Sequence, residues 1–225
     1  LVERMWKLMQ APAGAPFAIV SFDLNRFRLI NDALGHDAGD LVLCTVAERM
    51  RSVAPAGSAL GRLAGDEFGL VVQGDAAAAQ SAADAVTGQV AVPFSVNGYE
   101  FSLTATSGIA FHPAGGSDPE ALLREADQQR HRVKRSQRGS HHSRASAANP
   151  LDEIQTEHEL RQGLERGELE VHYQPIVRLG HPGLAGAEAL IRWNHPQRGL
   201  LVPARFLAVA EQAGLMRQIS RAVLG

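Results

Sequence analysis

The sequence has only one cysteine, Cys44, which lies in an apolar helical stretch. A single cysteine can form neither an internal disulfide nor a thiolate cage for a metal ion, so both kinds of stabilisation are excluded. A chain without disulfides suits a reducing compartment, and we expect the protein to be cytoplasmic. Cys44 itself is interpreted as a small buried hydrophobic residue rather than as a reactive thiol.

The chain also lacks a strong charge of either sign and a long apolar run. Its formal net charge is −2, so it has no basic field to attract nucleic acid, and nucleic-acid binding is not expected. No apolar run approaches the ~18 residues that span a bilayer, and no signal peptide is visible, so no membrane segment is expected in this chain. Because the sequence starts at Leu1 and its last residues resemble a helix cut short, both ends are interpreted as truncations of a longer protein.

What the chain does have is a regular succession of apolar segments separated by turn residues. The Asn97-Gly98 pair is a strong hairpin signal between two of these segments. The whole order suits an α+β fold in which helices pack on an antiparallel sheet. Helical periodicity predicts helices at 1–10, 27–34, 37–50, 76–90 and 119–135, and apolar runs predict strands at 17–23, 60–63, 68–72, 92–96 and 101–111.

Composition changes after the last of these helices. Residues 136–150 contain almost no large apolar side chain and are interpreted as a linker. We therefore divide the chain into a first domain at 1–135, the linker, and a second domain at 151–225. The second domain is too short for the alternating strand–helix barrel that its beginning suggests. Its pattern predicts a helix at 151–166, strands at 169–176 and 185–193, and a further helix after Pro203.

Three carboxylates are expected to meet at one edge of the first sheet. Asp23 ends the first buried strand, and Asp66 and Glu67 open the strand that follows a tight turn. Like charges this close repel one another unless a cation compensates them. Oxygen ligands of this kind suit Mg²⁺, which proteins usually hold with one or two carboxylates. Spacing alone also allows three solvated acids at strand ends, so both interpretations stay open at this point.

The residues around these carboxylates resemble the signatures of GGDEF domains, the diguanylate cyclase family. The segment 23–40 (DLNRFRLINDALGHDAGD) is similar to the first signature of that family, and the segment 62–68 (RLAGDEF) is similar to the motif that names it. The resemblance extends to about residue 140 and implies a nucleotidyl-cyclase-like sheet, the ferredoxin-like palm. A third match lies in the last predicted helix of the domain: Ala126, Asp127, Lys134 and Arg138.

The resemblance also implies a role for each matching residue. Asp23 and Asp66 would bind the divalent metal ions, Mg²⁺ or Mn²⁺, helped by the backbone carbonyl of Leu24. Asp66 and Glu67 would be catalytic, with Glu67 standing beside the metal or assisting deprotonation of the attacking 3′-hydroxyl. The remaining substrate-binding residues would be Asn31 and Asp40 for guanine, Gly65 for close approach to a phosphate, and Lys134 and Arg138 for phosphate oxygens. A solvated basic helix end is the alternative interpretation of that last pair.

The implied substrate is GTP, and the implied product is cyclic-di-GMP. A carboxylate such as Asp40 can accept hydrogen bonds from guanine N1–H and N2–H₂ together, and adenine offers no such pair. A charged hydrogen bond is worth about 1.5–3 kcal/mol, so GTP would be preferred over ATP. Each domain would hold one GTP, and a second copy of the domain would have to face the first for the two nucleotides to condense.

Three departures from the family pattern bear on activity (Ala64 and the last helix) or on its inhibition by product (Pro55 and Ser58). Ala64 stands where the family has its first glycine, which causes strain only if that position needs a positive φ. Pro55 and Ser58 replace an Arg-x-x-Asp pair that forms a product-inhibition site in many members. A non-catalytic GTP-binding domain that regulates an attached phosphodiesterase is therefore the alternative function, and a pure dimerisation module is a third. The last departure is in the final helix, where a small, an apolar and an aromatic residue are replaced by Gln129, Arg130 and His131.

The second domain resembles the opening of an EAL phosphodiesterase domain, on the residues 173–176 (YQPI), 187–193 (AEALIRW) and His195-Pro196. In that family the glutamate matching Glu188 is catalytic and ligates Mg²⁺ or Mn²⁺. The remaining ligands of that metal site lie in later strands, before which this sequence ends, so we expect this chain not to hydrolyse cyclic-di-GMP. The residues that would touch cyclic-di-GMP are Gln174, Leu190 and Arg192.

Overall fold

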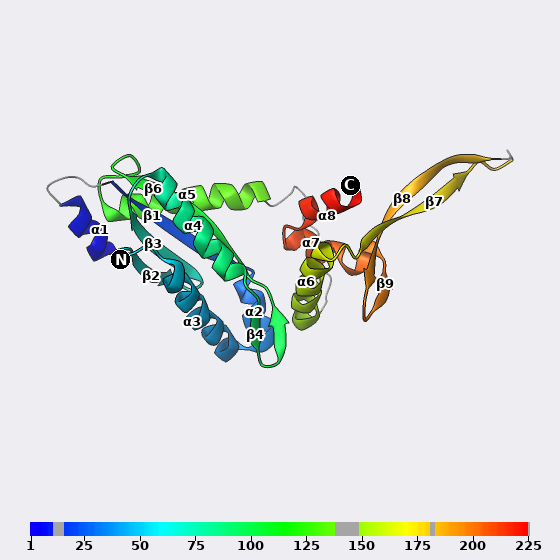
Figure 1. The fold of residues 1–225 in the computed structure, drawn as a ribbon, viewed down its shortest axis with the longest axis horizontal. Helices are drawn as coiled ribbons and strands as arrows, with labels where there is room; N and C mark the ends of the chain where they lie inside the picture. The colour runs from blue at the N-terminus through cyan, green and yellow to red at the C-terminus, as the bar shows by residue number, and fades with distance from the viewer. Residues whose placement is uncertain (11–15, 138–148, 181–182, 225) are drawn as a thin grey trace. The chain divides into compact units, whose positions relative to one another are not determined.

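The computed structural model describes residues 1–10, 16–137, 149–180 and 183–224, and it forms two compact units, Leu1–Gln137 and Arg138–Gly225. The elements of both units are drawn in Figure 1. The first unit is built on a four-stranded sheet in the order β2-β3-β1-β6, and every neighbouring pair is antiparallel. Its strands are β1 (Phe17–Asn25), β2 (Ala59–Ala64), β3 (Glu67–Gln73) and β6 (Thr104–His112), and a separate hairpin contains β4 (Phe94–Val96) and β5 (Tyr99–Phe101).

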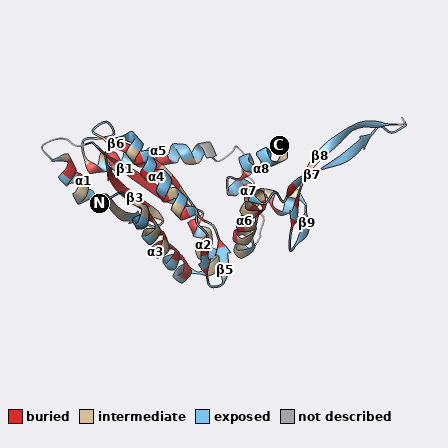
Figure 2. Ribbon diagram, viewed as in Figure 1, coloured by how far each residue is buried: buried red, intermediate tan, exposed pale blue. Residues whose placement is uncertain are grey.

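Helices cover both faces of this sheet. Phe17 and Ile19 of β1 form one buried cluster with residues of α1 and α5. Helix α4 contacts β1, β3 and β6, and α3 packs beside it, so the alternate residues of β1 are buried as well. Strand β1 is therefore coloured as buried along most of its length in Figure 2. The helices of this unit are α1 (Val2–Met9), α2 (Phe27–Leu34), α3 (His36–Val53), α4 (Ala76–Ala91) and α5 (Pro119–Gln137).

The predicted α+β class and antiparallel sheet are confirmed, with two local corrections. The strand predicted at 101–111 is interrupted, because β5 ends at Phe101 in its own hairpin and β6 begins at Thr104. That hairpin turns at Asn97 and Gly98, which have φ of 53° and 81°, as its sequence predicts. Cys44 is exposed rather than buried, because α3 turns other residues, Leu43 and Val46 among them, toward the core.

The second unit is a small helical and three-stranded assembly around one tryptophan. Trp193 is fully buried, and Leu160, Phe206 and Leu215 pack in the same cluster. The sheet order is β7-β8-β9; β9 was not expected from the sequence, and the helix predicted after Pro203 is broken into three short helices. The elements are α6 (Pro150–Glu165), β7 (Leu169–Val177), β8 (Leu184–His195), β9 (Gly199–Leu201), η1 (Pro203–Arg205), α7 (Leu207–Gln212) and α8 (Met216–Leu224).

The far end of the β7–β8 hairpin leaves apolar side chains in solvent. Tyr173 is 71% exposed and Leu184 is 73% exposed, and Figure 2 colours this part of the hairpin as exposed. Apolar side chains on a strand are normally buried against another layer. As for membranes, within the described residues no helix is both long enough and apolar enough to cross a bilayer.

Candidate functional site

The candidate site lies at the end of β1, where its neighbours β3 and β6 flank it. Asp23 stands opposite Glu67 in the β1–β3 register and opposite Thr106 in the β1–β6 register. Asp66 lies in the turn just before β3, and its carbonyl oxygen accepts a hydrogen bond of 3.2 Å from the Leu24 amide. The fold therefore brings the three predicted carboxylates to one edge of the sheet, from two adjacent strands.

A glycine on β6 allows α5 to lie close to this edge. A Cβ placed on Gly108 would overlap the carbonyl oxygen of Ala126 and the amide nitrogen of Arg130, and it would lie 2.8 Å from Arg130 Cβ. Backbone atoms of a helix cannot move aside as the tip of a side chain can, so the close approach requires glycine. Because of this contact, the side chains of Arg130 and Lys134 on α5 reach β1.

Arg130 is the centre of the charge network at this site. Its side chain is 2% exposed; Nη1 donates to Asp23 Oδ2 at 3.0 Å, and Nη2 donates to Glu67 Oε1 at 2.6 Å and to an oxygen of Asp127. Lys134 Nζ pairs with the other oxygen of Asp23. Burial by itself would lower the pKa of Arg130, but the hydrogen bonds to Glu67 and Asp127 and the charge of Asp23 raise it above its usual value.

The pKa of Asp66 is affected by the neighbouring acidic side chains. Burial raises the pKa of Asp66, and a backbone hydrogen bond works in the opposite direction. The negative charges of Asp23 and Glu67 raise this pKa further, whereas the positive charge of Lys134 lowers it. The three carboxylates are thus close enough to interact electrostatically.

The residues in these positions do not fit a divalent metal ion. Both oxygens of Asp23 and Oε1 of Glu67 already bind the cationic side chains, whereas Mg²⁺ needs carboxylate oxygens of its own at about 2.0–2.1 Å. Among the residues that the structure describes, no group of three or more Asp, Glu, His or Cys side chains is arranged to hold an ion. The backbone carbonyl of Leu24, the predicted third ligand, belongs to the same edge as Asp23.

The predicted guanine-reading residues come together at the α2–α3 junction. A Cβ on Gly39 would overlap Asn31 Oδ1 and lie 3.2 Å from Phe27 Cζ, so the Asn31 amide lies directly against the residue before Asp40. Asp40 is exposed and Asn31 is half-buried. A polar pair that is open to solvent on one side can accept a planar ligand without prior rearrangement of the core.

The structure describes only two of the three residues that are predicted to contact phosphate. Gly65 has φ of +47° in the exposed β2–β3 turn, and the positive φ therefore falls on Gly65 and not on Ala64, so alanine causes no strain there. Lys134 is half-buried and paired with Asp23 rather than open to a ligand. Arg138 lies outside the described residues.

In the second unit, the predicted residues share one face of the β7–β8 hairpin. Gln174 stands directly opposite Glu188, and both are exposed. Leu190 and Arg192 follow Glu188 at two-residue steps on β8, so their side chains lie on the same face. Arg192 Nη1 donates to the carbonyl oxygen of Ile191 at 2.8 Å.

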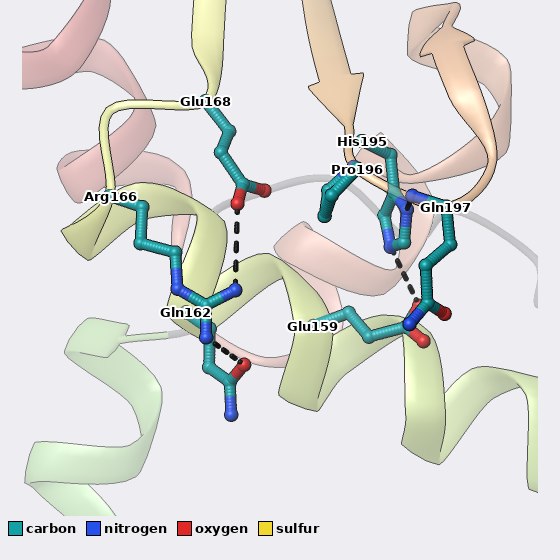
Figure 3. Close-up of a pocket in the computed structure, with 7 residues that line it drawn as sticks. All are labelled: Glu159, Gln162, Arg166, Glu168, His195, Pro196 and Gln197. Atoms are coloured by element: carbon teal, nitrogen blue, oxygen red, sulfur yellow. Dashed lines mark hydrogen bonds and ion pairs between the residues drawn. The ribbon is translucent and has the colours of Figure 1, made fainter.

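A small polar pocket of about 80 Å³ lies at the other end of this hairpin, between α6 and the end of β8 (Figure 3). His195 Nε2 lies 3.2 Å from Glu159 Oε2, and Arg166 forms an ion pair with Glu168 at 3.6 Å. Glu168 also accepts a hydrogen bond of 3.0 Å from the indole of Trp193. The polar groups of this pocket thus pair with one another and fasten β8 to α6. The residues that line it are Glu159, Gln162, Arg166, Glu168, His195, Pro196 and Gln197.

Sequence reasoning missed the role of Arg130. It identified this residue as a departure from an apolar family position, but assigned it no partner. The available signal was a charged residue at a core-facing position of α5, because a buried charge in a protein is normally paired. Asp127, matched as part of a motif, proves to be one of those partners.

Comparison with known proteins identifies the family that each part of the chain resembles. The family model "Diguanylate cyclase, GGDEF domain" matches residues 2–140, and the "EAL domain" model matches residues 157–225. The solved GGDEF domain of YfiN from Pseudomonas aeruginosa is 32% identical with a TM-score of 0.57, covering 60% of this chain and 86% of that one. A sensory box/GGDEF family protein from Caulobacter crescentus is 33% identical with a TM-score of 0.57, covering 60% of this chain and 90% of its own.

Curated relatives match across both parts of the chain. The "Bifunctional diguanylate cyclase/cyclic di-GMP phosphodiesterase MucR" of Pseudomonas aeruginosa is 39% identical over 92% of this chain, and the "Cyclic di-GMP phosphodiesterase NbdA" of the same organism is 38% identical over 94% of it. The chain spans only 31% and 27% of the lengths of these two relatives. The family model covers more than half of the chain, so the chain belongs to the diguanylate cyclase GGDEF domain family and continues from residue 157 into a partial match to the EAL domain.

Proposed function

We propose that the first unit is a GTP-binding regulatory GGDEF domain in a cyclic-di-GMP signalling protein, and that it does not itself condense GTP. The observation that carries this proposal is the pairing of Asp23 and Glu67 with Arg130. Phosphoryl transfer depends on positioning and on metal ions that neutralise developing charge. Carboxylates that already bind a guanidinium are not available to hold such metal ions. The residues predicted to bind guanine, Asn31 and Asp40, are not part of this charge network.

Nucleotide binding would use the residues that remain accessible. Asp40 would accept from guanine N1–H and N2–H₂, and the neighbouring Asn31 would supply the complementary amide. The β2–β3 turn at Gly65 would let backbone amides approach a phosphate. The bound nucleotide would regulate an attached EAL domain, in which Glu188 would ligate Mg²⁺ or Mn²⁺ and Gln174, Leu190 and Arg192 would contact cyclic-di-GMP. The single cysteine supports a cytoplasmic location.

A second candidate function is diguanylate cyclase activity. It is favoured by the retention of Asp66, Glu67 and Lys134 at one sheet edge and by relatives named as bifunctional enzymes. It would require Mg²⁺ or Mn²⁺ to displace Arg130, and two copies of the domain to face each other. The two functions differ in turnover and in the need for a homodimer, not in nucleotide recognition.

The experiment measures binding and turnover on the same protein. Calorimetry should find GTP binding that Asp40→Ala weakens, and chromatography after incubation with GTP and Mg²⁺ or Mn²⁺ should find no cyclic-di-GMP. Asp37→Ala serves as the matched control, because this acid lies one helical turn before Asp40 on α3. Formation of cyclic-di-GMP that disappears in Glu67→Gln would establish the second candidate instead.

A further inference from the structure

The buried position of Arg130 is unusual for its place on α5. The family pattern has an apolar residue there, and the arginine is among the largest fully buried side chains of the chain. Its Nε has no hydrogen-bond partner among the described residues, as is expected when a guanidinium occupies a space suited to an apolar side chain. Only the two terminal nitrogens are satisfied, and all of their side-chain partners are carboxylates.

The guanidinium joins Asp23, one of the two predicted carboxylate ligands, to Glu67, the residue that follows the other predicted ligand, Asp66. Nη1 binds Asp23 on β1, and Nη2 binds Glu67 on β3, which is the cross-strand neighbour of Asp23. A planar fork with fixed donor directions can serve two carboxylates at once, which an ammonium group does less well. Asp127 holds the same Nη2 from within α5 and fixes the direction of the fork.

Two positive charges of the chain itself already lie at the site. Arg130 and Lys134 together bring two positive charges to Asp23, which equals the charge of one Mg²⁺. Arginine keeps its proton throughout the physiological range, so this compensation is permanent. A metal ion that took Asp23 would leave a buried guanidinium with fewer partners, and an unpaired buried charge is strongly unfavourable.

We propose that Arg130 replaces a divalent cation between Asp23 and Glu67, so that the cation at these two carboxylates is supplied by the chain itself and Mg²⁺ and Mn²⁺ are excluded from Asp23. Arg130 is then the residue that decides which cation occupies the site. The opposite substitution, Arg130→Leu, restores the apolar family residue and releases Asp23 Oδ2 and Glu67 Oε1, while Lys134 keeps its contact with the other oxygen of Asp23. It should convert the edge into a metal-binding site.

The test titrates Mn²⁺ into the full chain without nucleotide and measures bound ion by the loss of the free Mn²⁺ electron paramagnetic resonance signal. Wild type and Asp23→Asn should bind Mn²⁺ equally, because Asp23 is already occupied. Arg130→Leu should bind Mn²⁺ at least about tenfold more tightly than wild type, a difference of about 1.4 kcal/mol. Adding Asp23→Asn to that variant should abolish the gain.

The control variant distinguishes an effect specific to position 130 from the general effect of removing one positive charge from α5. Arg132→Leu removes the same charge from an exposed position of the same helix and should bind no more Mn²⁺ than wild type. Circular dichroism establishes that each variant is folded. The proposal is overturned if wild type binds Mn²⁺ in a manner that Asp23→Asn abolishes, a comparison that does not depend on the folding of Arg130→Leu. It is equally overturned if folded Arg130→Leu gains no affinity. Since no nucleotide is present, failure to bind GTP would leave this result unaffected.

Discussion

Gly108→Ala should destabilise the first unit by forcing α5 away from β6. The added Cβ would overlap two backbone atoms of α5 and would crowd Arg130 Cβ at 2.8 Å, and no side-chain rotation relieves such overlaps. Overpacking of this kind costs about 1–3 kcal/mol. For a unit of this size, each kcal/mol lowers the unfolding midpoint by about 4 °C, so we expect a decrease of about 4–12 °C.

The matched control is Gly88→Ala, also a methyl addition. Gly88 is an exposed position within α4, and a Cβ there would meet no atom within 4 Å. Alanine is favoured over glycine in a helix interior by up to about 1 kcal/mol, so the midpoint should rise. Far-UV circular dichroism follows the melt, while in a Trp6→Phe background the fluorescence of the buried Trp193 monitors the second unit, which should not change. A Gly108→Ala midpoint equal to that of wild type, with the Gly88→Ala midpoint raised, would refute this close packing.

Three further predictions concern the ligands and the second unit. Asp40→Ala should weaken GTP binding by about 10- to 150-fold in calorimetry, the equivalent of the 1.5–3 kcal/mol of a charged hydrogen bond. Cyclic-di-GMP titrated into the chain should show no binding that depends on Pro55 and Ser58, because neither side chain can form the arginine–guanine or carboxylate contacts of an inhibitory site. Residues 146–225 expressed alone should show no cooperative melt and no hydrolysis of cyclic-di-GMP with Mg²⁺ or Mn²⁺, because the exposed apolar hairpin lacks a covering layer.

Each of these predictions has a definite contrary result. Unchanged GTP affinity in Asp40→Ala, beside a normal Asp37→Ala control, would remove the guanine assignment. Tight cyclic-di-GMP binding that changes on substitution of residues 55–58 would restore the inhibitory site. A cooperative melt of residues 146–225 together with metal-dependent hydrolysis would show that the second unit is self-sufficient.

Local patterns predicted the elements of the first unit well, because apolar runs and turn residues act over short distances. The Asn97-Gly98 hairpin is one example, since both residues tolerate the positive φ that such a turn needs. The position of Arg130 could not be predicted in this way. Its partner Asp23 lies 107 residues earlier in the chain, and helical propensity describes a lysine- and arginine-rich helix end as solvated. The burial of Arg130 depends on Gly108, which lies on a third element, β6.

The ion pairs of Arg130 and Lys134 lie in the last turns of α5, the helix that ends the first unit. The order of that helix end is therefore linked thermodynamically to the occupancy of Asp23 and Glu67. A ligand that competes for these carboxylates must spend part of its binding free energy on releasing α5, and by reciprocity any partner that holds α5 in place weakens that ligand to the same degree. The carboxylate edge and the last turns of α5 thus form the two ends of one coupled equilibrium.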